Sequence, residues 1–147
     1  MNKYRTHTCG ALSKKEKNKD VSLSGWINKK RDHGNLLFID LRDNYGITQC
    51  VVEKTNIIFN EIEKQSLETV INIKGKVVER SKETINSEIK TGEIEIKINS
   101  FEILGKTKEL PLPVFSDQEY AEEIRLKYRF LDLRRNKIHQ NIILRSK

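Results

Sequence analysis

Two kinds of side chain that hold single-stranded nucleic acid occur close together in the first third of the chain. Three consecutive cations, Lys29, Lys30 and Arg31, end one strand-like stretch, and Phe38 lies among the aliphatic residues of the next. Cations bind phosphates, while an aromatic ring gives a base a surface on which to stack. A solvated strand end is the alternative interpretation of the cations, because most charge runs simply face water.

The position of Phe38 on its strand favours an exposed ring. In residues 36–42 one set of alternate positions is wholly aliphatic, namely Leu37, Ile39 and Leu41. Because successive side chains of a strand point to opposite faces, this set is expected in the core. Phe38 then shares the other face with Asp40 and Arg42. A ring folded over the edge of the core is the alternative.

The elements that must position these residues follow from alternation and turn chemistry. Strands are predicted from Val21 to the cations, then at 36–42, 47–53, 69–79 and 93–99. Ile57, Ile58, Ile62 and Leu67 have helical spacing, and a short helix or loop is expected at 12–19. This order predicts a mainly β fold, the five-stranded OB-fold Greek-key barrel with a helix between strands 3 and 4, which binds oligonucleotides across strands 2 and 3.

Three further residues fall on the expected binding face of such a barrel. His33 lies in the loop after the cations, Gln49 on the third strand and Glu95 on the last. The alternation around Gln49 does not decide which way it points. Glu95 faces outward, either as a solubilising residue or as an acceptor for an exocyclic amine of a base. His33 is either an ordinary turn residue or a base reader.

The composition favours a polyanionic partner. The net charge is +7 in 147 residues, which suits nucleic acid or an acidic membrane surface. No apolar run approaches the ~20 residues of a membrane-spanning helix, and the N-terminus lacks a secretory signal. Cys9 and Cys50 have no motif spacing, which indicates a reducing cytoplasm and no metal site. No arrangement for nucleophilic catalysis and no Gly-rich phosphate loop occurs, so no catalytic residue is expected.

The last third of the chain changes character. Residues 110–114 (LPLPV) read as an extended linker, and residues 119–147 are charge-dense with helical periodicity and apolar side chains that need a partner. We therefore expect a barrel domain at 1–104, a linker or hinge at 105–118, and the start of a further domain at 119–147 that continues beyond Lys147.

Several motifs in a fixed order resemble one family. They are 23–26 (LSGW), 31–32 (RD), 37–43 (LFIDLRD), 46–49 (GITQ), 91–95 (TGEIE) and 125–135 (RLKYRFLDLRR). Together they resemble the N-terminal region of bacterial-type aspartyl-tRNA synthetases, which are class II aminoacyl-tRNA synthetases, along essentially the whole chain.

The resemblance implies roles for individual residues. Phe38 would stack on the middle anticodon base, a uridine, and Gln49 would hydrogen-bond it, while Arg31 and Glu95 would help to read the flanking bases. Lys29, Lys30, His33, Arg80 and Asn86 are further expected tRNA contacts. Thr84 stands where relatives have an asparagine, so the contribution of that loop stays open.

The resemblance also implies a full-length enzyme. Such an enzyme is a cytoplasmic aspartate–tRNA ligase, expected to be a homodimer, that uses ATP and Mg²⁺; the class II motifs are expected beyond Lys147, so these 147 residues should bind no cofactor and be inactive alone. The expected partner is tRNA-Asp, with tRNA-Asn as an open alternative because His33 is commoner in enzymes that charge both. A stand-alone single-strand-binding OB-fold protein without enzymatic activity is the alternative function.

Overall fold

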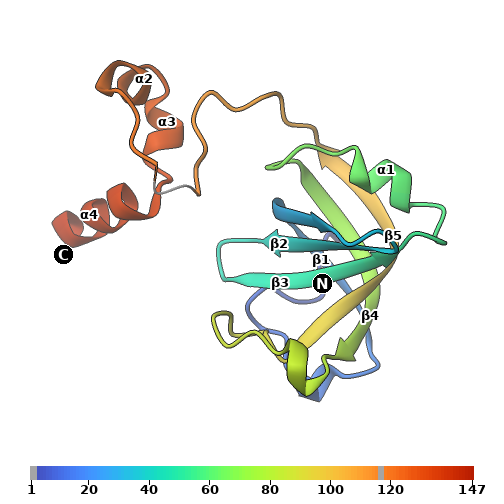
Figure 1. The fold of residues 1–147 in the computed structure, drawn as a ribbon. Coiled ribbons are helices and arrows are strands. Elements are labelled where there is room, and N and C mark those ends of the chain that lie inside the picture. The colour runs from blue at the N-terminus through green and yellow to red at the C-terminus, as the bar shows by residue number, and fades with distance from the viewer. Residues whose placement is uncertain (1–2, 116–117) are drawn as a thin grey trace. The chain divides into compact units, whose positions relative to one another are not determined.

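The computed structural model describes residues 3–115 and 118–147, and its contacts divide the chain into two units, Met1–Thr107 and Lys108–Lys147. The first unit contains a closed barrel whose strands neighbour one another in the order β1-β2-β3-β5-β4 (Figure 1). The strands are β1 (Asp20–Asp32), β2 (Leu36–Arg42), β3 (Ile47–Glu53), β4 (Val70–Glu79) and β5 (Ile94–Gly105). This topology confirms the predicted mainly β, five-stranded OB-fold barrel.

The aliphatic face of β2 lies in the barrel core as predicted. Leu37, Ile39 and Leu41 are buried, as are the alternating isoleucines of β5, Ile94, Ile96 and Ile98. β5 extends beyond the predicted strand to Gly105, because it continues to pair with β4 as far as Val70. The core therefore fixes which face of β2 and β5 remains outside the barrel.

The helix between β3 and β4 is shorter than its spacing predicted. The helix α1 (Phe59–Glu63) buries Phe59 and Ile62, whereas Ile57 is 94% exposed. Two side chains bracket it. Asn56 accepts a hydrogen bond from the backbone of Ile58 before the helix begins, and Lys30 donates to the carbonyls of Glu63 and Gln65 where it ends. A lysine ammonium at a helix C-terminus satisfies carbonyls that lack intrahelical partners.

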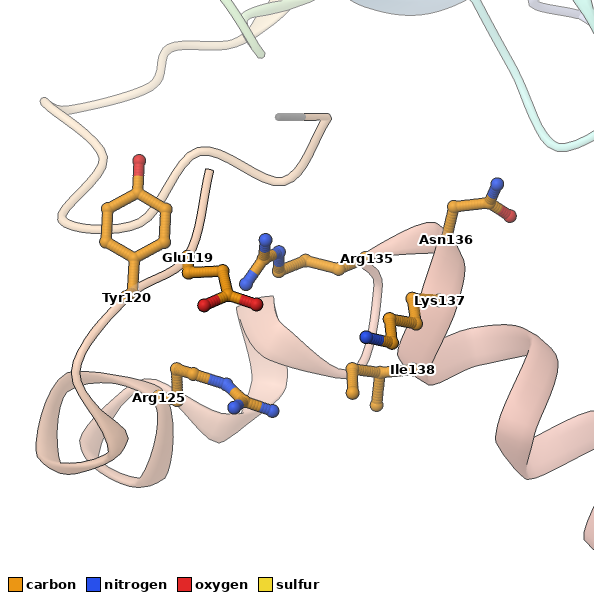
Figure 2. Close-up of a pocket in the computed structure, with 7 residues that line it drawn as sticks. All are labelled: Glu119, Tyr120, Arg125, Arg135, Asn136, Lys137 and Ile138. Atoms are coloured by element: carbon orange, nitrogen blue, oxygen red, sulfur yellow. The ribbon is translucent and has the colours of Figure 1, made fainter. Parts of the chain in front are cut away.

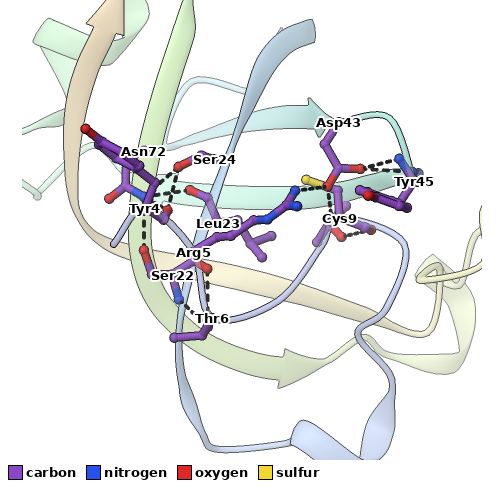
Figure 3. A network of polar contacts seen from close by, with 12 residues as sticks. Tyr4, Arg5, Thr6, Cys9, Ser22, Leu23, Ser24, Asp43, Tyr45 and Asn72 are labelled. Carbon is purple, nitrogen blue, oxygen red and sulfur yellow. Dashed lines mark hydrogen bonds and ion pairs between the residues drawn. The ribbon is translucent and has the colours of Figure 1, made fainter. Parts of the chain in front are cut away.

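The residues before β1 are tied across the barrel by polar contacts (Figure 3). The carbonyl of Tyr4 accepts from Asn72, and the carboxylate of Asp43 accepts from the backbone N–H of Cys9 at 2.9 Å and pairs with Arg5 at 3.5 Å. Thr48 donates to the carbonyl of Cys9. These contacts cover one end of β3. A short 3-10 helix, η1 (Lys14–Glu16), follows and begins with a capping box from Ser13 and Glu16.

Burial controls the chemistry of the two cysteines. Both thiols are buried and free. Burial, with a smaller contribution from the Asp43 carboxylate, raises the pKa of Cys9 to about 12. Burial also raises the pKa of Cys50. Both thiols therefore stay protonated and unreactive near neutral pH. Across residues 3–115 and 118–147, no group of His, Cys, Asp or Glu could hold a metal ion, and no helix could cross a membrane.

The second unit contains three short helices, α2 (Glu122–Lys127), α3 (Arg129–Asp132) and α4 (Asn136–Ser146). Leu112 and Val114, from the stretch predicted as a linker, are buried with Leu131 in its small core. The carboxylate of Asp132 is fully buried and pairs with three arginines, Arg125, Arg129 and Arg135. A buried carboxylate requires such compensation, so Asp132 holds α2, α3 and the start of α4 together.

Candidate nucleic-acid interface

Strand pairing brings the main predicted site residues to one place on the barrel surface. Arg31 of β1 opposes Phe38 of β2 in the register, and Asp40 of β2 opposes Gln49 of β3. A pocket of about 250 Å³ forms over these strands and the β4–β5 loop, and it is lined by Arg31, His33, Phe38, Gln49, Arg80, Thr84 and Glu95. Residues far apart in the sequence thus meet in one concave surface, which we call the barrel pocket.

Phe38 lies on the outer face of β2, as the alternation predicted. Its side chain is half-buried, and the ring of His33 meets it edge-on, with ring centroids 5.3 Å apart and an interplanar angle of 88°. Edge-to-face contact of this kind orients an aromatic ring and can leave one of its faces available. Phe38 is therefore suited to stack on a planar ligand.

Gln49 is held by charged groups at both ends of its amide. Arg31 Nη2 donates to Gln49 Oε1 at 3.1 Å, and Gln49 Nε2 donates to Glu95 Oε2 at 2.9 Å. Guanidinium only donates and carboxylate only accepts, so reversing the amide would oppose two donors at one end and two acceptors at the other. The question that alternation left open is answered: Gln49 lies on the outer face, in the barrel pocket, and its orientation is set.

Arg80 lines the barrel pocket and has hydrogen-bond donors that lack a partner among the described residues. Its Nε and Nη1 atoms are buried and have no hydrogen-bond partner within the part of the chain that the structure describes. Leaving buried donors unpaired costs stability, so the Arg80 guanidinium is expected to turn toward an acceptor, such as a phosphate or a base carbonyl, that enters the pocket.

Three of the expected contact residues do not line the barrel pocket. Lys29 is exposed on β1. Lys30 is engaged with α1, and its burial lowers the pKa of its ammonium. The side chain of Asn86 accepts a hydrogen bond from the backbone of Glu88 within the β4–β5 loop. Thr84 does line the pocket, and its hydroxyl bonds Ser81 in the short 3-10 helix η2 (Lys82–Thr84).

Sequence reasoning missed one residue beside the barrel pocket, Asp40, which contacts the pocket residue Arg31. It accepts a hydrogen bond from Arg31 Nη2 at 2.8 Å, and its side chain is 17% exposed. The available signal was its position two residues after Phe38 on the same face, with a charge opposite to that of Arg31. Only the pairing of β1 with β2 shows that the two charges meet.

A second pocket lies within the second unit (Figure 2). It is lined by Glu119, Tyr120, Arg125, Arg135, Asn136, Lys137 and Ile138. The guanidinium of Arg135 lies 5.5 Å from the centre of the Tyr120 ring, and Arg125 is bound to Asp132. None of the residues that the sequence predicted for nucleic-acid binding lines this pocket.

Comparison with known proteins gives consistent matches. Residues 21–104 match the family model described as OB-fold nucleic acid binding domain. The chain is 76% identical over 147 residues to the aspartate–tRNA(Asp/Asn) ligase of Pelagibacter ubique and 55% identical over 146 residues to that of Rhodopseudomonas palustris strain BisB18. In both cases it spans 25% of the relative's length.

Solved structures resemble the chain in the same way. The asparaginyl-tRNA synthetase of Pyrococcus horikoshii matches 87% of this chain and 28% of its own, with a TM-score of 0.72 and 26% identity. A putative aspartyl-tRNA synthetase from Leishmania major matches 91% of this chain with a TM-score of 0.71 at 20% identity, which supports the fold. The relatives agree with the resemblance that the sequence motifs indicated.

Proposed function

Because the chain belongs to the family of OB-fold nucleic acid binding domains, we propose that it recognises the anticodon of tRNA-Asp as the N-terminal part of an aspartate–tRNA ligase. The observation that carries the proposal is the barrel pocket, in which a stacking ring, an oriented amide and unpaired guanidinium donors lie together. Phe38 stacks on the middle uridine, Gln49 bonds its edge, and Arg31, Glu95 and Arg80 contact the flanking bases and phosphates. Lys29, Lys30 and Asn86 remain proposed tRNA contacts outside the pocket.

The proposal extends to a longer protein, since the chain spans about a quarter of the curated relatives that it matches. In that protein residues 105–118 form the hinge, and residues 119–147 begin the catalytic domain. The whole attaches aspartate to tRNA with ATP and Mg²⁺ and acts as a cytoplasmic homodimer. Its catalytic groups belong to that further domain, and no cofactor is assigned to the 147 residues themselves.

An RNA titration tests the proposed anticodon recognition. The affinity of the chain for a labelled tRNA-Asp anticodon stem-loop is compared with its affinity for a stem-loop whose middle uridine is cytidine, at two salt concentrations. We expect a preference for uridine of about tenfold, in line with the 1–3 kcal/mol that a good bidentate contact contributes. The preference should persist at higher salt, because base contacts release no counterions. Equal, salt-labile binding would instead identify a general single-strand binder.

We propose further that the chain accepts both tRNA-Asp and tRNA-Asn, whose anticodons end in C and U. The relatives' names specify tRNA(Asp/Asn), and His33 lines the barrel pocket. A neutral imidazole has one donor and one acceptor, so it can pair with either pyrimidine. The wild-type chain should bind the tRNA-Asp and tRNA-Asn anticodon stem-loops with affinities within about threefold of each other. His33→Leu should widen the ratio of these two affinities to about tenfold, because an apolar side chain leaves polar base atoms unpaired. A ratio unchanged by His33→Leu would contradict this role.

A further inference from the structure

Asp40 lies beside the barrel pocket without lining it. Its carboxylate is on the outer face of β2, where it opposes Lys29 on β1 and Gln49 on β3 in the register. Its side chain is 17% exposed, against 37% for that of Arg31. Arg31, Gln49 and Glu95 line the pocket and Asp40 does not. Apart from the effect of its charge, Asp40 is therefore expected to act on a ligand there through another side chain.

The contact with Arg31 decides which donors of that guanidinium remain for a ligand. Arg31 Nη2 donates both to Asp40 Oδ1, at 2.8 Å, and to Gln49 Oε1, at 3.1 Å. An Nη atom carries two hydrogens, so both are used. The Nη1 and Nε donors have no protein partner among the residues described. Asp40 thus fixes the guanidinium with one nitrogen on Gln49 and the other two available to a ligand.

The same contact orients Gln49. Its Oε1 atom is held by Arg31 and its Nε2 atom by Glu95, which leaves one acceptor and one donor position of the amide for a base. Uracil presents an N3–H donor beside the O4 acceptor, whereas cytosine presents the N3 acceptor beside an N4–H donor. An amide held one way round therefore matches one pyrimidine, and the reversed amide matches the other. If Arg31 moves, Gln49 loses the contact that holds Oε1, and Glu95 alone holds the amide.

We propose that Asp40 is a positioning residue that sets the base selectivity of the barrel pocket by holding Arg31, and through it the amide of Gln49. This inference rests on the proposed function, namely that the pocket reads a pyrimidine. Asp40 touches no base in this arrangement. It is one end of a chain of contacts, Asp40–Arg31–Gln49–Glu95, which joins β2, β1, β3 and β5.

The variant Asp40→Asn tests the proposal because its expected effects on the two stem-loops differ. Asparagine keeps an acceptor oxygen but loses the charge that holds the guanidinium. The affinity for the uridine stem-loop should fall, while that for the cytidine stem-loop should stay the same or rise, because a negative charge near phosphates is removed. We expect the ratio of the two affinities to fall about fivefold, within the range that one base contact supplies.

A matched control separates positioning from charge and from stability. Glu102→Gln removes one negative charge from an exposed position on β5, outside the pocket and the contact chain. It should strengthen binding to both stem-loops slightly and leave their ratio unchanged. Thermal melting of both variants verifies that the barrel remains folded. Equal weakening of both RNAs by Asp40→Asn, or an unchanged ratio, would overturn the proposal.

Nuclear magnetic resonance of the RNA-free chain gives a readout that does not depend on the proposed function. The side-chain NH₂ resonances of Gln49 should shift in Asp40→Asn and stay in place in Glu102→Gln. If the wild-type chain failed to discriminate uridine from cytidine, the proposed anticodon recognition would be contradicted. If the Gln49 resonances were then also unchanged in Asp40→Asn, the positioning role would be overturned. Shifted resonances would support that role for whichever base the pocket binds.

Discussion

Replacing Phe38 by alanine is expected to weaken binding of the anticodon stem-loop by roughly 5- to 150-fold, which corresponds to the 1–3 kcal/mol that a stacked base contributes. The ring lies on the outer face of β2, and His33 holds it edge-on at 5.3 Å between centroids. Because the ring lies outside the core, the substitution is expected to lower the affinity for RNA and not the stability of the fold. Fluorescence anisotropy with a labelled stem-loop measures it.

Two further variants make this expectation specific to stacking. Phe38→Tyr keeps the ring and should bind within about twofold of the wild type, because a phenol presents the same π-face to a base. Tyr45→Ala removes an aromatic side chain that is 59% exposed and does not line the barrel pocket. It should leave affinity unchanged. The salt dependence of Phe38→Ala should equal that of the wild type, since no phosphate contact is lost. Undiminished affinity in a folded Phe38→Ala would remove the stacking role.

Alternation predicted the outward position of Phe38 but failed for Gln49, and the reason is physical. β2 has one face in the core and one outside, so polarity alternates along it. In β3 the five residues from Thr48 to Val52 are all buried. The segment before β1 covers Thr48, and the contact chain covers Gln49. A strand covered on both faces carries no alternation from which a side chain's direction could be inferred.

Other features depend on contacts that no local pattern encodes. The spacing of apolar residues suggested a longer helix than α1. Lys30, which contacts the carbonyls at the end of this helix, lies on β1, so no local pattern marks that end. Gly10 and Gly46 are a similar case. A Cβ on Gly10 would lie 2.3 Å from the carbonyl oxygen of Tyr45, so two segments can approach only where side chains are missing. Residue type predicted which groups could bind RNA, and strand pairing decided which of them meet.

Replacing Gln49 by alanine is expected to abolish the preference for uridine over cytidine at the middle anticodon position. The expected loss of discrimination is about tenfold, equivalent to about 1.4 kcal/mol and within the range of one base contact, because alanine offers neither donor nor acceptor to the base. The substitution also leaves Glu95 without its amide donor and Arg31 with Asp40 as its remaining contact in the chain. Titrating the uridine and cytidine stem-loops against the variant measures the ratio of their affinities.

The two variants should fail in different ways, and this difference is the strongest test of the barrel pocket. Phe38→Ala removes a surface on which either pyrimidine stacks, so both stem-loops should lose affinity and their ratio should persist. Gln49→Ala removes the oriented amide, so the ratio should approach one while the cytidine stem-loop loses little affinity. Since Gln49 is 5% exposed and its amide is held at both ends, a retained uridine preference in Gln49→Ala would mean that another group reads the base, with Arg31, His33 and Arg80 among the other donors of the pocket.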